Sequence, residues 1–301
     1  MTDQLFGVVP NFSEGRRPDV IDEIVAALRV PGARVVFAEA DADHNRLDTT
    51  VLGSADAVQR SALAGALKAI ELIDMTAHHG GHPRMGAADV IPFMPVRAAS
   101  MDDAVVIARA FAERLARSAG IPVYLYDQAA LSAERASLAE VRKGEFEGLR
   151  DAVAAGERLP DFGPRELGRA GATAVGARRP LIAFNVYLDG TDAGAAKEIA
   201  RAVRGSSGGL PAIRAIGFAV PERGGIVTVS MNLVNHEVTG LLAAYDAVAA
   251  QAGAAGMKIL DSEIVGLVPA AAIAEDDIAR LQLRGFDPDS QILERLAGED
   301  Q

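Results

Sequence analysis

One order of expected elements occurs twice along this chain of 301 residues, and it limits the possible folds more than any other feature. In the first half, short apolar runs predict strands, and apolar residues spaced three or four apart predict helices. Pro18 at the first position of one helix and the capping Ser54 before the other mark where the helices begin. The strands fall at residues 5–9, 33–38, 47–52 and 89–93. The order strand–helix–strand–strand–helix–strand is that of a ferredoxin-like βαββαβ unit.

The second half shows the same order of elements with little sequence in common. Strands are predicted at 181–188, 213–220, 226–234 and 257–265, and helices at 191–205 and 236–251. Residues 221–225 predict a hairpin turn between the two middle strands. We therefore predict an α/β (α+β) fold of two tandem βαββαβ ferredoxin-like subdomains, residues 1–179 and 180–301. Two helix-covered sheets packed face to face would leave a cleft or tunnel for a ligand.

Further elements are expected between the two units. Ser100 and Asp103 form a capping-box pattern for a helix that ends at Gly120, and a strand follows at 122–127. Pro92 and Pro95 lack the N–H group that a central strand uses. They predict that the strand at 89–93 is short or lies at an edge.

Composition excludes several classes of protein. The formal net charge of −11 argues against a protein that coats nucleic acid, which needs a basic face. The chain has no cysteine, so disulfides, thiolate nucleophiles, iron–sulfur clusters and cysteine-ligated zinc are excluded. No apolar run is long enough to span a membrane, and the N-terminus lacks a signal-peptide pattern. We expect a soluble, cytoplasmic protein with no nucleic-acid or membrane partner.

Three of the five histidines lie in one glycine-rich loop, residues 78–86. It has three interpretations. It is a solvated loop in which histidines happen to cluster, or a metal site of His78, His79 and His82, or a site of proton exchange in which Arg84 binds a carboxylate. The metal interpretation is the weakest, because this histidine spacing suits a helix and the segment is not one.

Two further segments concentrate charge. Residues 39–46 gather carboxylates at the end of a strand, but lack the glycine and the distal glutamate of a calcium loop. They form either a polar hairpin connection or a surface that faces a cationic substrate group. Spacing does not reveal whether this hairpin lies near the histidine loop. A basic cluster in the acidic chain is either a solvated linker or an attractor for a polyanionic ligand; it consists of Arg165, Arg169, Arg178 and Arg179.

Several motifs resemble those of the glutamate formiminotransferase family. The most specific are VPNFSEGR at residues 9–16 and HPRMGA at 82–87, which continues into DVIPF at 89–93. Other matching segments follow in family order, at 122–126, 161–164, 171–178, 181–185 and 265–269. The resemblance covers nearly the whole chain. Because the chain ends at Gln301, we expect the cyclodeaminase domain of the animal enzymes to be missing.

The resemblance implies transfer of a formimino group from N-formimino-L-glutamate to N5 of the co-substrate tetrahydrofolate. It also implies a homodimer without a metal, with His82 as the catalytic histidine. The folate-binding stretch, one residue shorter here, maps onto Gly163, Pro164, Arg165, Glu166, Leu167, Gly168, Arg169, Ala170 and Gly171. The candidate substrate-binding residues are Glu39, Asp41, Asn45, Arg46, Arg84 and Asp89. Glu39 replaces an aspartate of the animal enzymes and Gly81 a glutamate, two departures that can shift substrate preference.

The expected chemistry uses acid–base catalysis. Neutral His82 would take the proton of N5 as it attacks the amidine carbon, and the imidazolium would protonate the departing glutamate nitrogen. Glu39 or Asp41 could hold the amidinium, and Arg84 or Arg46 the substrate carboxylates. Three alternatives remain: formiminoglycine as the donor, an ATP-dependent 5-formyltetrahydrofolate cyclo-ligase, and a non-catalytic folate or amino-acid sensor.

Overall fold

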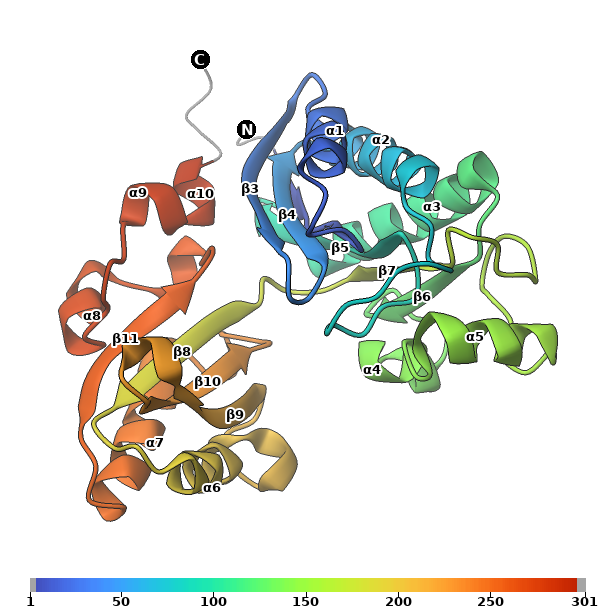
Figure 1. The fold of residues 1–301 in the computed structure, drawn as a ribbon. Helices are drawn as coiled ribbons and strands as arrows, with labels where there is room; N and C mark the ends of the chain where they lie inside the picture. Colours follow the sequence, from blue (N-terminus) through green and yellow to red (C-terminus); the bar gives the residue numbers. More distant parts are fainter. Residues whose placement is uncertain (1–3, 297–301) are drawn as a thin grey trace. The chain divides into compact units, whose positions relative to one another are not determined.

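The computed structural model describes residues 4–296, the side chain of Glu222 excepted. The backbone divides into two compact units, Met1–Arg178 and Arg179–Gln301, each with its own hydrophobic core. In Figure 1 the first unit runs from blue to yellow-green, and the second from yellow to red.

The N-terminal unit contains the predicted βαββαβ arrangement. Its strands are β1 (Leu5–Val8), continued after a break by β2 (Asn11–Phe12), then β3 (Ala33–Asp41), β4 (Arg46–Gly53) and β5 (Ala88–Arg97). The interrupted strand β1/β2 lies between β4 and β5, and β3 pairs with β4 outside it, which is the ferredoxin-like order. Helices α1 (Pro18–Leu28) and α2 (Ala55–Leu72) pack against each other, and Ser54 caps α2 as predicted.

The prediction for the fourth strand of this unit is wrong. β5 is ten residues long and central, with β1 and β2 on one side and a parallel strand on the other. The sheet tolerates Pro92 because the missing N–H falls opposite the break between β1 and β2, where Val9 N donates to Pro92 O at 3.0 Å. Pro95 pairs with Phe6 at a bulge in the ladder, where pairing is already irregular.

Two more strands extend this sheet to seven. The predicted helix α3 (Met101–Ala119) has its capping box at Ser100 and its left-handed cap at Gly120, and the predicted strand β6 (Val123–Asp127) follows it. Strand β7 (Thr173–Ala177) lies between β5 and β6, parallel to both. β7 is fully buried, so the solvated-linker interpretation of the basic cluster is wrong for the residues between Arg169 and Arg178 that form β7, whereas Arg165 and Arg169 are exposed. Gly176 is needed there because a Cβ would lie 2.5 Å from the Tyr126 ring.

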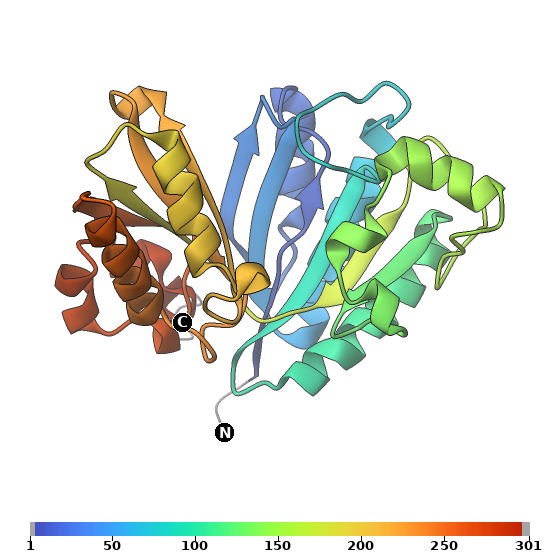
Figure 2. The ribbon, with the colours of Figure 1, turned by 90° about the horizontal axis from the view of Figure 1, so that it is seen from below.

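An insert between β6 and β7 carries short helices that the sequence pattern did not predict. They are η1 (Ala133–Arg135), α4 (Leu138–Val141) and α5 (Glu145–Ala154). In Figure 2 these green helices run beside the teal loop that joins α2 to β5. The insert therefore lies next to the segment that carries the clustered histidines.

The C-terminal unit is a second ferredoxin-like unit, with the sheet order β11-β8-β10-β9. Its strands are β8 (Ile182–Leu188), β9 (Ile213–Val220), β10 (Ile226–Leu233) and β11 (Ile259–Val265). Its helices are α6 (Ala193–Val203), η2 (Gly205–Ser207), η3 (Pro221–Arg223), α7 (Leu241–Ala254), η4 (Ala270–Ala272), α8 (Glu275–Arg280), α9 (Pro288–Gln291) and α10 (Leu293–Leu296). The predicted hairpin of β9 and β10 is confirmed.

Helix α7 begins five residues later than predicted. Asn235 starts a polar turn instead, in which its side chain accepts from Glu237 N at 3.1 Å and its carbonyl from Thr239 N at 3.1 Å. Such a turn competes with the helix for the same backbone groups. The helices after β11 were not predicted.

Candidate active site

Two loops of the N-terminal unit meet at one end of its sheet. The turn between β3 and β4 contacts the loop 73–87 between α2 and β5, where Gly81 N donates to Asp43 O at 3.2 Å. A Cβ at Gly80 would lie 2.3 Å from the carbonyl oxygen of His44, so only glycine allows this approach. The structure thus brings together the acidic hairpin and the histidine loop, which spacing could not establish.

Asn45 ties these loops to the segment after β2. Its Oδ1 accepts from Gly15 N at 2.9 Å, and its Nδ2 donates to His79 O at 2.9 Å. Both ends of the amide are thus occupied by backbone, and the side chain is buried. The geometry gives Asn45 a role in shaping the site.

His82 has one ring nitrogen committed and the other available. Nδ1 lies 2.7 Å from Pro83 O, and because a carbonyl only accepts, Nδ1 must carry the proton. Nε2 then has a lone pair, and it forms no hydrogen bond within residues 4–296. Burial lowers the pKa of His82, and the positive charge of Arg46 lowers it further. The half-buried imidazole is therefore neutral at pH 7, as a general base must be.

A second imidazole lies beside His82. The ring centroids of His44 and His82 are 6.1 Å apart and the rings meet edge to face. Asp41 Oδ2 lies 2.6 Å from His44 Nδ1 and orients that ring. Hydrogen bonds from the His44 backbone and side chain lower the pKa of Asp41, so its half-exposed carboxylate is ionised at neutral pH. Sequence reasoning named Asp41 but missed His44, although it stands in the acidic segment.

Asp89 is a buried carboxylate that connects three parts of the site. Its Oδ1 accepts from Met85 N at 2.8 Å, and its Oδ2 accepts from Arg46 at 2.8 Å and from Arg142. Burial alone would raise the pKa of Asp89, but the two guanidinium groups outweigh it and the net shift is downward. A fully buried carboxylate thus stays ionised because it is paired twice.

Arg46 is completely engaged inside the protein. Besides Asp89, it donates to Asn11 Oδ1 at 2.6 Å and to Asp48 Oδ1 at 2.9 Å. Asn11 belongs to the motif at residues 9–16, so the motif that supported the resemblance also supports the site. Asn11 was not predicted as a site residue, although its place in that motif was a signal.

Arg84 links the histidine loop to the insert. Its guanidinium group pairs with Glu145 at 2.7 Å and with Glu147 at 2.7 Å, and its Nε donates to His78 Nδ1 at 3.4 Å. The bond from Arg84 lowers the pKa of Glu147 to about 2. The fork predicted for a substrate carboxylate therefore already holds two carboxylates of the protein.

Glu39 lies in β3, opposite Asp48 of β4. It is exposed, two residues before Asp41, at the same end of the hairpin. Of the predicted carboxylates, Glu39 and Asp41 are accessible, whereas Asp89 is buried.

The predicted folate-binding stretch, residues 163–171, contacts the loop 73–87 near both ends of that loop. Met75 N donates to Arg169 O at 2.8 Å, and Ala87 N donates to Ala170 O at 2.8 Å. A Cβ at Gly171 would lie 2.3 Å from Met85 O, so the backbones touch. The exposed members of the stretch are Gly163, Pro164, Arg165, Glu166, Gly168 and Arg169, and the buried ones are Leu167, Ala170 and Gly171.

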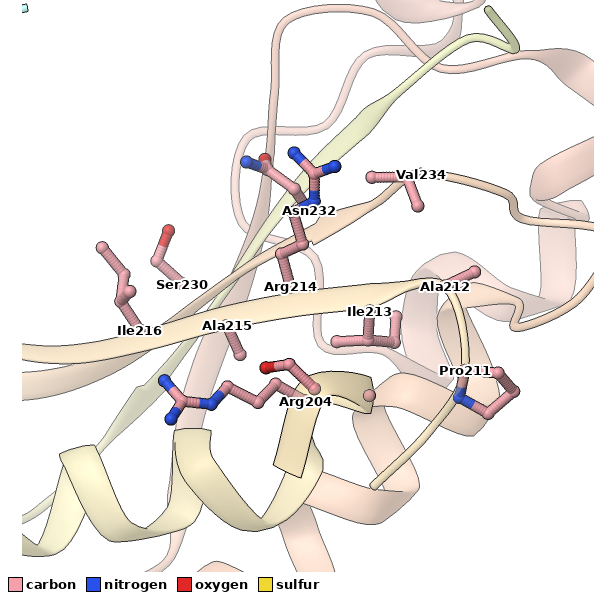
Figure 3. A pocket seen from close by; sticks show the side chains of 12 residues that line it. Arg204, Pro211, Ala212, Ile213, Arg214, Ala215, Ile216, Ser230, Asn232 and Val234 are labelled. Atoms are coloured by element: carbon pink, nitrogen blue, oxygen red, sulfur yellow. The ribbon is translucent and has the colours of Figure 1, made fainter. Parts of the chain in front are cut away.

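The charged side chains of the C-terminal unit gather around Tyr187, where Arg223 and Arg284 pair with Asp261 and Glu263, and no histidine belongs to this group among the described residues. An open pocket of about 580 Å³ lies at β9 (Figure 3), but its two arginines do not converge. Arg214 projects from the sheet face opposite α6, while Arg204 follows the end of α6 on the other side. On the sheet, Arg223 pairs with Asp261 at 2.7 Å and stacks over Tyr187.

Residues 4–296 contain neither a metal-binding cluster nor a membrane-spanning helix. No group of three or more histidines, aspartates and glutamates there is arranged to hold a metal ion. No helix in that range is long and apolar enough to cross a membrane.

Comparison with known proteins matches both units of the chain to one family. The model of the formiminotransferase domain, N-terminal subdomain, matches residues 5–178, and that of the formiminotransferase domain matches residues 183–293. A glutamate formimidoyltransferase of Streptococcus pyogenes serotype M1 is 43% identical over 95% of this chain and 96% of its own length. The protein of the same name from Thermoplasma acidophilum is 42% identical over 95% of both chains. The formimidoyltransferase-cyclodeaminase of Sus scrofa is 42% identical over 90% of this chain, which spans 51% of that longer protein. The chain belongs to the formiminotransferase family.

Proposed function

We propose that this protein is a glutamate formimidoyltransferase, which transfers the formimino group of N-formimino-L-glutamate to N5 of tetrahydrofolate. The observation that carries the proposal is the likeness, over 95% of the chain, to two proteins named for this activity. The neutral His82, with a free Nε2 at the meeting of two loops, is what such a transfer needs.

His82 acts as base and then as acid. N5 of tetrahydrofolate attacks the amidine carbon, and Nε2 of His82 takes the proton that N5 loses. The imidazolium then gives this proton to the glutamate nitrogen as its bond to the carbon breaks. Glutamate leaves, and the formimino group stays on N5. The transfer changes no oxidation state and needs no covalent enzyme intermediate.

Carboxylates of the hairpin hold the amidinium end of the donor. Asp41 is suited to this because it is ionised, half-exposed and next to the imidazole pair. Exposed Glu39 lies two residues away on the same strand. Arg165 and Arg169, exposed in the predicted folate-binding stretch, attract the anionic tail of the folate.

We assign binding of the donor's carboxylates to Arg46 and Arg84, each of which must first release a partner that it holds within the protein. Both guanidinium groups are already paired, so binding requires an exchange of partners. Arg84 is the better suited, because Glu145 and Glu147 are 43% and 53% exposed and can turn to solvent. In Arg46 the main partner is the buried Asp89. We further propose that the enzyme works in the cytoplasm as a homodimer.

An assay of the purified protein tests the proposal. Under anaerobic conditions with tetrahydrofolate and N-formimino-L-glutamate, we expect 5-formiminotetrahydrofolate and glutamate in equal amounts. Parallel reactions with formiminoglycine, and with 5-formyltetrahydrofolate and ATP, distinguish the two alternative enzymes. Binding of folate without any product would favour a sensor and would overturn the proposal.

A further inference from the structure

Arg142 is a charged residue of the insert that reaches into the candidate active site. It follows α4 directly and is far from the site in sequence, yet its guanidinium group pairs with Asp89. The side chain is 12% exposed, and its Nε is buried without a hydrogen-bond partner within residues 4–296. Burying a guanidinium group with an unsatisfied N–H costs about 1–3 kcal/mol, so a specific use is expected.

In the cluster of Arg142, Asp89 and Arg46, the guanidinium group of Arg46 has no donor left for a substrate. All three guanidinium nitrogens of Arg46 have protein partners. Asp89 also accepts from Met85 N, three residues after His82, and so fixes the end of the histidine loop. Arg142 thus joins the insert to a carboxylate that binds both the hairpin, through Arg46, and the histidine loop, through Met85 N.

The charges that face His82 come from every element around it. Strand β4 supplies Arg46, strand β5 supplies Asp89, and the end of α4 supplies Arg142. The hairpin turn supplies His44 with its ionised partner Asp41. The histidine loop itself also carries His78 and Arg84, which contact each other, and Arg84 is paired with Glu145 and Glu147.

The buried cluster therefore carries one negative and two positive charges. Without Arg142, the pair of Arg46 and Asp89 would be neutral, and the imidazolium form of His82 would meet less repulsion. Both arginines lower the pKa of His82 and Asp89 raises it, after burial as the main cause of the downward shift.

We propose that Arg142 is a positioning residue for His82: Arg142 fixes Asp89 at the end of the histidine loop and adds to the positive charge that disfavours the imidazolium form. This role rests on the proposed function of His82 as a base. It explains why an insert with no catalytic side chain of its own is anchored to the site at Asp89 and again at Arg84.

The test is an NMR titration of the His82 imidazole in the free protein, assigned by comparison with His82→Asn. In Arg142→Met, we expect the pKa of His82 to rise by about half a unit or more, because a nearby positive charge is removed. In Arg142→Lys, which keeps the charge, it should stay within about 0.2 units of the wild type. The acid limb of kcat/KM should move with the titration, while KM for tetrahydrofolate changes less than about twofold.

Arg158→Met is the matched control for a merely structural role. Arg158 holds the same insert through the carbonyls of Lys143, Glu140 and Val141, and it does not contact Asp89. This variant should leave the pKa of His82 unchanged. Equal shifts in Arg142→Met and Arg158→Met, or no shift in Arg142→Met, would overturn the proposal.

Arg142→Gln keeps the test valid if the methionine variant does not fold. Glutamine can still donate to Asp89 but has no charge, so it should raise the pKa of His82 as methionine does. An unchanged pKa in a folded Arg142→Gln protein contradicts the electrostatic role. Because the titration needs no substrate, it distinguishes failure of this inference from failure of the proposed transferase activity.

Discussion

The two units of this chain share one topology and differ in where they place charge. In the N-terminal unit, α2 and β5 are joined by the long loop 73–87, which folds back onto the β3–β4 turn. In the C-terminal unit, residues 255–258 suffice between α7 and β11, and Lys258 N simply bonds Asp189 at 2.8 Å. With the same strand order, the longer loop of the N-terminal unit brings histidines to the hairpin, whereas the short connection of the C-terminal unit does not.

The ion pairs of the two units differ in the same way. Asp89 is fully buried under two arginines, whereas Asp261 of β11 is 20% exposed and pairs with the partly exposed Arg223 and Arg284. A buried pair contributes little net stability but is costly to break. Removing one partner of the buried pair should therefore cost the N-terminal unit more unfolding free energy than the same change in the partly exposed pair costs the C-terminal unit.

The largest difference between the units should appear when a histidine is removed from each. His82→Ala should lower kcat for formimino transfer by about 10²–10⁴-fold, because a positioned acid–base group contributes that much. Its affinity for tetrahydrofolate, measured by calorimetry, should change much less. His236→Ala in the C-terminal unit, which also removes a histidine with a pKa lowered by burial, should keep most of the activity.

Two results would contradict the prediction for the histidine variants. Wild-type-like turnover in His82→Ala would remove His82 from the mechanism. An equal loss in His236→Ala would show that both units contribute acid–base groups.

Neutralising one aspartate in each unit should separate the two kinds of ion pair. Asp89→Asn leaves two buried arginines without their carboxylate, so the N-terminal unit should lose about 3–5 kcal/mol of unfolding free energy. Asp261→Asn should cost the C-terminal unit about 1 kcal/mol or less, because its partners reach solvent. Pulse-labelling hydrogen exchange in urea, read on peptides of β5 and of β8, follows each unit separately. Equal losses in the two units would show that burial does not set this cost.

Periodicity predicted most of the fold, because short apolar runs and helix caps are local signals. Ser54, Ser100 and Gly120 each mark a helix end as expected. Prediction failed where tertiary contacts decide. Pro92 is central because the neighbouring strand breaks opposite it, and the glycine-containing β7 is a strand because Tyr126 covers Gly176. Neither of these tertiary contacts can be predicted from the neighbouring residues in the sequence.

The candidate site was predictable only in part, for the same reason. Residue types in polar loops pointed to a group of histidines and a group of acids, and only the family resemblance singled out His82 as the catalytic candidate. Arg142 carries no local signal, since it stands in an unpredicted insert and acts through a residue of β5. Residue type suggested that Arg84 was free for a substrate, but only the structure shows the two glutamates that hold it.

Replacing a glycine by alanine should change stability in opposite directions in the two units, because the loops of the N-terminal unit are in close backbone contact. Gly80→Ala would place a Cβ 2.3 Å from the His44 carbonyl oxygen, so the loops must separate. We expect a loss of about 1–3 kcal/mol of stability and a lower kcat. Gly253 lies in α7 with no atom within 4 Å of its added Cβ. Gly253→Ala should therefore stabilise its unit by about 0.5–1 kcal/mol.

Urea unfolding with the same local readout measures both glycine variants. A neutral Gly80→Ala protein with normal kcat would mean that the two loops need not touch for activity. A destabilised Gly253→Ala would contradict the open space around that helix position.

Lowering the pH should reduce the unfolding free energy of the N-terminal unit more than that of the C-terminal unit. We expect this to be the smallest of the four predicted differences between the units. Burial lowers the pKa of His78 and His82 in one unit and of His236 in the other, below the ordinary value of 6.5. The unfolded chain then binds protons near pH 6.5 that the folded chain does not yet bind, so stability falls as pH decreases from 7.5 to 5.5. The paired aspartates titrate below this window, so they do not contribute to it. Unfolding free energies are measured at pH 7.5 and at pH 5.5 by hydrogen exchange, with the labelling pulse at one fixed pH. The decrease in unfolding free energy at the lower pH should be larger for peptides of β5 than for peptides of β8. A C-terminal unit that is equally or more acid-sensitive would show that the histidines near the site are no more desolvated than His236, and would weaken the argument for a neutral His82.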